Sequence, residues 1–121
     1  MPKTEIELFA EEDGSCPLLE WLDTIPQKAQ DKCIVKVERL NEMGLELRRP
    51  EADFLRDKIH ELRAALSGIQ YRLLYFFHNK KGIISHGLIK KGEKVPLKEI
   101  DLAKDRKERY EINPTKHTFR R

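Results

Sequence analysis

The sequence predicts an α+β fold with the element order β-α-α-β-β-β-α. In this fold an N-terminal helical hairpin packs on one face of an antiparallel sheet, and a C-terminal helix follows the sheet. Three observations predict it. Apolar side chains recur at helical spacing between Pro17 and Gly44, the period falls to two in three successive segments after residue 57, and helical spacing returns after Pro96.

The first part of the chain is predicted to contain a short strand and two helices. Residues 4–10 alternate apolar and polar side chains, which is typical of a half-buried strand. Ser15 can cap a short helix that has Pro17 in its first turn, and a longer helix is expected from Pro26 to Gly44. The apolar stripe of the longer helix consists of Ala29, Cys33, Ile34, Val37 and Leu40.

The second part is predicted to contain the sheet and the last helix. Residues 45–57 show neither period and are interpreted as a connection. Strands are predicted at residues 58–66, 69–78 and 83–91, with a turn at 67–68 and a hairpin loop at 79–82 in which Gly82 can take a positive φ. The last helix begins after Pro96 and ends at Asn113, before Pro114.

The length of 121 residues is that of one domain. We interpret residues 1–113 as a single domain and residues 114–121 as a basic, loose C-terminal tail. No apolar run is long enough to cross a membrane, and the acidic opening does not resemble a signal peptide, so we expect no membrane partner. Cys16 and Cys33 lack metal-ligand spacing, and we expect a reduced, cytoplasmic protein.

Charge is distributed unevenly along the chain. Residues 1–55 contain 7 Lys or Arg against 13 Asp or Glu, whereas residues 56–121 contain 17 against 8. If the fold gathers the basic half on one face, that face attracts polyanions, of which nucleic acid is the commonest in a cytoplasm. A solvated basic surface without a partner explains the charge alone equally well.

Five cations are the first candidates for a phosphate-binding site. Arg72 lies in the middle of an apolar strand, where an arginine is costly unless its guanidinium reaches water or an anion. The other four, on the neighbouring strands or just beyond them, are Arg63, Lys90, Lys91 and Lys94. Their positions on adjacent strands favour a shared phosphate site. Which of Lys90 and Lys91 shares a face with Arg72 depends on a register that the sequence does not define.

Two further residues are candidates for chemistry. His86, inside the third strand of the sheet, could transfer protons, although a strand histidine is more often a hydrogen-bonded core residue. Tyr110, on the basic last helix, could stack on a base, whereas core packing is expected for Tyr71 and Tyr75. The basic half has no carboxylate cluster and no phosphate-binding glycine loop, so we expect neither a metal nor a cofactor. Nucleic-acid cleavage would then require the 2′-hydroxyl of RNA.

Several segments together resemble a known family. In order along the chain these are Ile59-His60-Glu61-Leu62-Arg63, Tyr71-Arg72-Leu73-Leu74-Tyr75-Phe76-Phe77, His86-Gly87-Leu88-Ile89-Lys90-Lys91 and Lys94-Val95-Pro96. They resemble the phage-derived Gp49-like toxins, the HigB branch of the RelE/ParE superfamily of type II toxin–antitoxin systems. Leu88 departs from the pattern, because an aromatic residue is usual there. The resemblance implies a RelE-like fold.

The resemblance also implies an activity. Such toxins are metal-independent mRNA interferases that cleave messages in the ribosomal A site, beside the 16S rRNA, and thereby inhibit translation. The expected catalytic residues are Arg63, Arg72, Lys90, Lys91, His86 and Tyr110, and the expected RNA-binding residues are Lys94, Lys98, Arg106 and Arg109. The expected partner is a HigA-like antitoxin with a helix-turn-helix fold.

Two other functions stay open at this point. A ParE-like toxin inhibits DNA gyrase without catalysis, and the clustered basic residues Arg63, Arg72, Lys90 and Lys91 argue against it. A non-catalytic module that binds RNA or the ribosome, such as a decayed toxin, is excluded by no residue. Cleavage of messages would separate both from an mRNA interferase.

Overall fold

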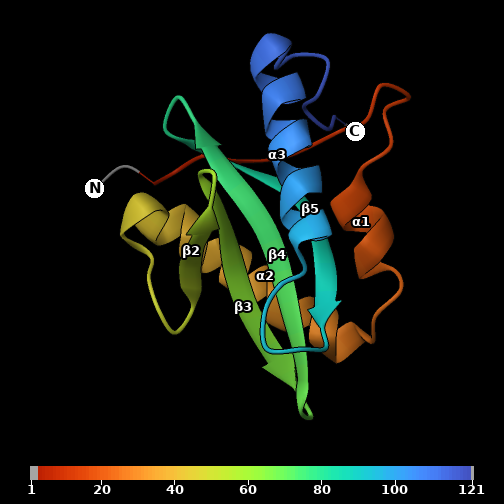
Figure 1. Cartoon of the computed structure of the whole chain (residues 1–121), viewed down its shortest axis with the longest axis vertical. Helices are drawn as coiled ribbons and strands as arrows, with labels where there is room; N and C mark the ends of the chain where they lie inside the picture. The colour runs from red at the N-terminus through yellow and green to blue at the C-terminus, as the bar shows by residue number, and fades with distance from the viewer. Residues whose placement is uncertain (1–2, 121) are drawn as a thin grey trace.

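The computed structural model describes residues 3–120 as an α+β fold with one sheet and helices on both of its faces (Figure 1). Its elements are β1 (Ile6–Leu8), α1 (Pro17–Leu22), α2 (Gln27–Met43), the 3₁₀ turn η1 (Gly44–Glu46), β2 (Ala52–Arg56), β3 (Ile59–Leu66), β4 (Ile69–His78), β5 (Lys81–Lys90) and α3 (Leu97–Ile112). The three predicted helices are confirmed. Prolines define where they begin, because Pro17 opens α1, while Pro26 and Pro96 directly precede α2 and α3.

The sheet has five strands in the order β1-β5-β4-β3-β2. β2, β3, β4 and β5 pair antiparallel, whereas β1 pairs parallel with β5. The prediction of a purely antiparallel sheet is therefore wrong at this edge. The prediction that residues 45–57 form only a connection is also wrong, because they contain β2. This strand has just five residues and follows Pro50. The alternation of apolar and polar side chains in it is therefore too short to predict a strand.

The turn between β4 and β5 differs in detail from the prediction. Asn79 and Lys80 take the positive φ values, 49° and 67°, and Gly82 lies inside β5. Two consecutive positive φ values match the twist of the strands on either side. The glycine lies close to the parallel edge strand, since a Cβ atom at Gly82 would be 2.9 Å from Ile6 Cδ1.

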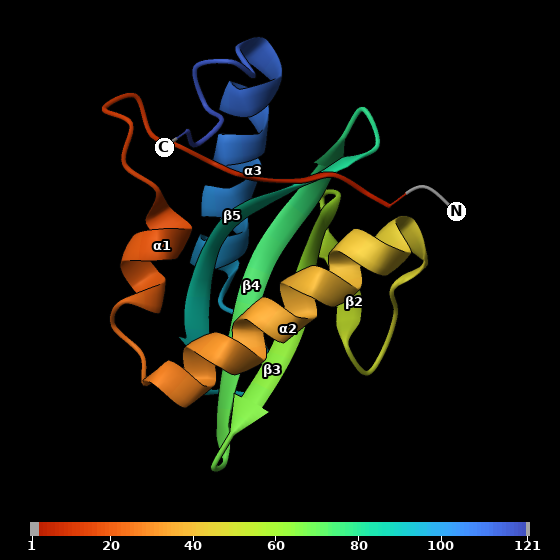
Figure 2. The same ribbon diagram turned by 180° about the vertical axis from the view of Figure 1, so that it is seen from behind.

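The two faces of the sheet carry separate cores. On one face α1 packs on β5 and α2 packs mainly on β3, as Figure 2 shows from behind. On the other face α3 packs over β4 and β5. β4 contributes alternate residues to both cores: Tyr71, Leu73 and Tyr75 to the first, Leu74 and Phe76 to the second. The two N-terminal helices therefore share one face as predicted, and α3 leaves the β2 side of the other face open.

The segment after α3 is not loose. The ring of His117 is buried and stacks on Phe9, with ring centroids 5.0 Å apart, and its Nδ1 lies 2.8 Å from the carbonyl oxygen of Ala10. The N–H of Phe119 donates to the carbonyl oxygen of Leu8 at 2.8 Å. The expectation of a loose tail is wrong for residues 114–120, because this segment continues the sheet edge beside β1. Residue 121 lies outside the described residues.

None of the helices in residues 3–120 is both long enough and apolar enough to cross a membrane.

Candidate functional site

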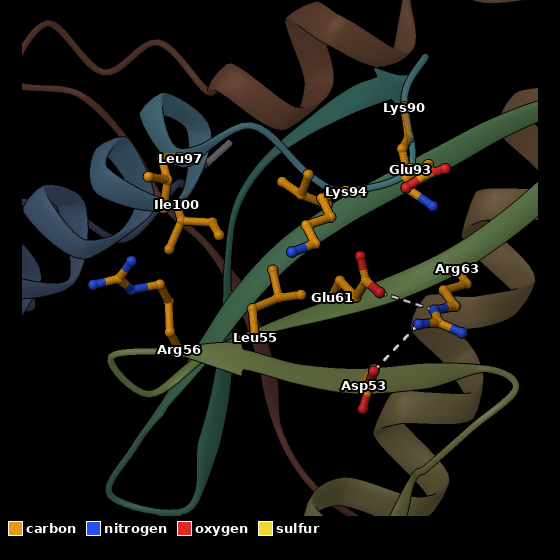
Figure 3. Close-up of a pocket in the computed structure, with 11 residues that line it drawn as sticks. Asp53, Leu55, Arg56, Glu61, Arg63, Lys90, Glu93, Lys94, Leu97 and Ile100 are labelled. Atoms are coloured by element: carbon orange, nitrogen blue, oxygen red, sulfur yellow. Dashed lines mark hydrogen bonds and ion pairs between the residues drawn. The ribbon is translucent and has the colours of Figure 1, made fainter.

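The open part of the second sheet face contains a cavity of about 510 Å³ (Figure 3). β2 and β3 form one side, and the end of β5, the loop after it and the first turn of α3 form the other. The lining residues are Asp53, Leu55, Arg56, Glu61, Arg63, Lys90, Glu93, Lys94, Val95, Leu97 and Ile100. Three of the predicted site residues, Arg63, Lys90 and Lys94, thus reach one cavity from three segments of the chain.

The strand register explains this convergence. Arg63 of β3 lies directly opposite Arg72 of β4, and Arg72 lies opposite Leu88 of β5. Residues opposite one another share a face, and so do residues two apart along a strand. Lys90, two residues after Leu88, is therefore on the face of Arg63 and Arg72. Lys91 follows the end of β5, is exposed, and does not line the cavity.

Arg63 is held by two carboxylates. Its Nε donates to Glu61 Oε2 at 2.8 Å, and its Nη2 donates to Asp53 Oδ2 at 3.2 Å (Figure 3). Arg49 also contacts Asp53, with Nη2 2.8 Å from the same oxygen. The hydrogen bond from Arg49 and the charge of Arg63 hold the pKa of Asp53 below its usual range. The guanidinium of Arg63 is thus oriented before any ligand arrives.

Arg72 lies behind this cluster, with only 5% of its side chain exposed. Its Nη1 donates to the carbonyl oxygen of Tyr71 at 3.0 Å. Its Nε is 3.2 Å from Glu61 Oε1, but the two are not aligned as a hydrogen bond, and both atoms are buried without a hydrogen-bond partner in residues 3–120. Glu61 therefore lies between two arginines, and Arg72 holds it from the buried side.

Among the residues that the structure describes, the lysines of the cavity are its cations without an acidic partner. Within residues 3–120, neither Lys90 nor Lys94 makes an ion pair, whereas Arg56 contacts Asp57 and Arg63 contacts two acids. In Figure 3 the side chain of Lys94 extends into the cavity toward Glu61. An anion entering the cavity therefore meets two free ammonium groups and one positioned guanidinium. Lys98 is exposed on the first turn of α3 and does not line the cavity.

His86 lies elsewhere, buried between β5 and α3. Its Nδ1 is 2.8 Å from the hydroxyl of Ser85, and its Nε2 is 3.1 Å from Glu99 Oε1. Burial, together with the nearby charge of Arg106, lowers the pKa of His86. His86 is thus a hydrogen-bonded core residue, which was the alternative to a role in proton transfer. It does not line the cavity.

Tyr110 is also a core residue. It is 1% exposed, packs against Phe76 and His78, and donates its hydroxyl hydrogen to Glu7 Oε1 at 2.6 Å. Burial, followed by the hydrogen bond with Glu7, raises the pKa of Tyr110 to about 12. The structure places this tyrosine away from the cavity and leaves no face of its ring for a base.

Arg106 and Arg109 are engaged within the protein. Both guanidinium groups contact Glu11, at 3.0 Å and 2.9 Å, and both lie over the ring of Phe9. Arg106 is only 8% exposed, so its guanidinium is not free for the RNA contact that was expected of it. An acidic residue of the N-terminal half thus neutralises basic residues of the C-terminal half, and the positive surface is smaller than the charge count suggests.

Three residues of the site, Asp53, Arg49 and Glu61, were not among the candidates predicted from the sequence. Asp53 and Arg49 lie in the segment that was interpreted as a connection. Asp53 faces Glu61 across the β2–β3 pair, and Arg63 lies between the two carboxylates. The alternation of Asp53, Phe54 and Leu55 is a weak signal that could have indicated the strand.

The fold and the cavity define a small α+β protein with a cation-lined pocket on an open sheet face. The family model described as "Phage derived protein Gp49-like" matches residues 20–108, about three quarters of the chain. The chain belongs to this Gp49-like family, a toxin-like family in the RelE/HigB superfamily whose members are commonly toxins of toxin–antitoxin systems. No curated protein matches the chain.

Proposed function

We propose that this protein is the toxin of a type II toxin–antitoxin system, of the HigB type, and that it cleaves messenger RNA in the ribosomal A site without a metal ion. The family membership supports a toxin, and the cavity supports a nuclease. The observation that carries the proposal is the convergence of Arg63, Lys90 and Lys94 on one open cavity. Cations in this arrangement stabilise the charge that develops on a phosphate during transfer.

The proposed reaction is attack by the 2′-hydroxyl oxygen of the RNA on the adjacent phosphorus. The bond from phosphorus to the 5′-oxygen breaks, which leaves a 2′,3′-cyclic phosphate and a 5′-hydroxyl. Arg63 binds the phosphate oxygens, and one of Lys90 and Lys94 donates a proton to the leaving 5′-oxygen. The proton of the 2′-hydroxyl passes to one of the accessible carboxylates of the cavity, Asp53 or Glu93, since only 4% of the Glu61 side chain is exposed.

In this proposal Arg72, Lys91, His86 and Tyr110 do not touch the RNA at the scissile bond. Arg72 is a positioning residue, because it holds Glu61, which in turn holds Arg63. The partner implied by the family is an antitoxin, for which we propose a HigA-like helix-turn-helix protein. The site of action would be the cytoplasm, where ribosomes and messages meet.

The test is induction of the protein in a bacterial host, followed by primer extension on an abundant message. The double variant Lys90→Gln/Lys94→Gln removes the two cations of the cavity that are unpaired in the described part of the chain. The control is Lys104→Gln, an exposed lysine of α3 that lines no cavity described above. We expect new 5′ ends within translated codons for the wild type and for Lys104→Gln, and a loss of at least a hundredfold for the double variant. In the same assay Asp53→Asn or Glu93→Gln should reduce cleavage, and Asp57→Asn should not.

Other results would contradict the proposal. If the double variant folds and cleaves like the wild type, the cavity is not the active site. Growth arrest with intact messages and inhibited DNA supercoiling would indicate a ParE-like gyrase inhibitor. Binding to ribosomes without cleavage or arrest would indicate a non-catalytic module.

A further inference from the structure

A second cavity, of about 500 Å³, lies beside the first one at the edge of the sheet. It is lined by Lys32, Val35 and Lys36 of α2, by Pro50, by Arg63, Ala64 and Ala65 of β3, and by Gln70 and Arg72 of β4. We propose that this second cavity binds a phosphate of the same RNA strand next to the scissile phosphate. The inference rests on the proposed nuclease function and extends it to the path of the substrate.

The charge of the second cavity favours an anion more strongly than that of the first. All four of its charged lining residues are cations, whereas the first cavity also contains Asp53, Glu61 and Glu93. Three of these charges are partly compensated, because Lys36 contacts Glu51 at 3.3 Å and Glu61 contacts both Arg63 and Arg72. Lys32 is exposed and makes no ion pair with any residue between 3 and 120, which leaves its ammonium group available to a ligand.

Arg72 gives the second cavity a buried donor with unfilled capacity. Five N–H bonds belong to a guanidinium, and burying them without acceptors is costly. In the described part of the chain, Nη1 donates to the carbonyl oxygen of Tyr71, Nε has no hydrogen-bond partner, and Nη2 makes no hydrogen bond. Because Nε faces Glu61 Oε1 at 3.2 Å, Nη2 is the donor of Arg72 that a phosphate in the second cavity would engage.

The backbone adds a neutral donor at the same place. β2 begins at Ala52, which pairs with Leu62, while β3 continues to Leu66, so the last residues of β3 have no neighbouring strand on that side (Figure 1). The N–H of Arg63 is the last to bond across this edge, to the carbonyl oxygen of Glu51 at 2.8 Å. In an antiparallel ladder alternate residues point the same way, so the N–H of Ala65 points to the open edge.

Arg63 connects the two cavities, because it lines both. A ligand that extends from one to the other must carry negative charge at more than one point along an extended chain. Single-stranded RNA, with one phosphate per nucleotide, fits this requirement and the chemistry of the first cavity. An acidic peptide is the competing occupant, and the test below separates the two.

The experiment measures the affinity for two uncleavable 2′-O-methyl RNAs, a hexanucleotide by fluorescence anisotropy and a dinucleotide with a single phosphate by NMR titration. The variant is Lys32→Gln, and Lys104→Gln is the matched control. We expect Lys32→Gln to weaken hexanucleotide binding several-fold and to reduce the slope of log K against log salt by about 0.7, the value for one phosphate contact on a single strand. Dinucleotide binding should not change.

Three results would overturn the inference. Equal hexanucleotide binding by Lys32→Gln and Lys104→Gln, with messages still cleaved by the wild type in cells, refutes the second phosphate site and leaves the proposed function standing. A wild type that neither cleaves messages nor binds the hexanucleotide refutes both. If a hexaglutamate peptide binds the wild type, and Lys32→Gln weakens that binding but not RNA binding, the cavity takes an acidic peptide.

Discussion

At the scale of single residues, the site depends on a buried carboxylate shared by two arginines. Glu61 lies 2.8 Å from Arg63 Nε and 3.2 Å from Arg72 Nε, and its side chain is 4% exposed. Buried charges of this kind are tolerated only with partners of opposite sign. The cost of the arginine in an apolar strand, noted from the sequence, is thus met by an acid on the neighbouring strand.

We predict that Arg72→Ala destabilises the protein by about 3–5 kcal/mol, because Glu61 would then keep a buried charge with one partner fewer. Urea unfolding followed by circular dichroism measures this change. Arg49→Ala is the control, since its side chain is 72% exposed and its loss should change stability little. An Arg72→Ala protein as stable as the wild type would show that Glu61 does not need this partner. The variant is accordingly a poor probe of catalysis.

At the scale of elements, the position of α1 on the sheet is defined by a glycine. Gly87 of β5 lies against the ring of Trp21, and a methyl group at Gly87 would overlap the ring atoms. Trp21 in turn meets Tyr71 of β4 edge to face, with ring centroids 6.2 Å apart. The absence of a side chain at one position of β5 therefore lets α1 approach the sheet.

Gly87→Ala should cost about 1–3 kcal/mol, because the indole ring must move from a packed position. Gly92→Ala provides the control, since nothing lies within 4 Å of the added methyl group there. Thermal unfolding of the two variants gives the comparison. Trp21→Leu introduced together with Gly87→Ala should recover part of the loss if the clash is the cause, and no recovery would count against it.

Much of this architecture could be predicted from the sequence, because long periodic segments carry a strong signal. The three helices and the strands β3, β4 and β5 were predicted from period and from proline positions. β2 was missed because five residues after Pro50 give too little pattern, and the parallel pairing of β1 depends on a crossover that no local signal records.

For the site, the cations could be predicted and their partners could not. Arg63, Lys90 and Lys94 stand out as bases near strand ends, and the structure brings them to one cavity. The pairing of Arg63 with Asp53 depends on the presence of β2 and on its register against β3, and local sequence patterns do not record either of these. Tyr110 and Arg106, which were expected to contact RNA, are instead buried. Their acidic partners Glu7 and Glu11 come from the N-terminal segment, and the pattern of the last helix does not show this.

At the scale of the whole molecule, ion pairs join the acidic and basic halves of the chain. Glu7 contacts Lys81 and Glu11 contacts Arg106 and Arg109, across about 75 to 100 residues of sequence. Burial opposes the charged form of Glu11, but hydrogen bonds from Arg109 and Arg106 prevail and lower its pKa below 4.5. These charges help to hold β1 against β5 and the segment after β1 against the last helix.

Acid should therefore weaken the fold. A carboxyl group whose pKa is lower in the folded than in the unfolded state contributes stability above about pH 4.5, and this contribution is lost as the pH falls further. In Glu11→Gln, we expect the loss of unfolding free energy between pH 5 and pH 3 to be smaller than in the wild type, by up to about 1 kcal/mol, the upper end for partly exposed ion pairs. Urea unfolding at each pH measures it.

Glu108→Gln is the matched control for this acid prediction. Glu108 is exposed on α3 and makes no ion pair with any other residue in the range 3–120. If Glu11→Gln and Glu108→Gln lose the same stability on acidification, the contacts of Glu11 with the last helix do not stabilise the folded state.

The parallel pairing of β1 with β5 has a consequence for biosynthesis. Ile6 pairs with Gly82, and Phe9 forms a bridge with Thr118. The partners of the N-terminal segment are therefore synthesised more than 70 residues after it. A chain leaving the ribosome N-terminus first cannot complete its sheet until β5 has emerged, and the first cavity also needs the first turn of α3. Contacts so distant in sequence form slowly. The nascent chain is therefore expected to acquire its cation-lined cavity only when synthesis is nearly finished.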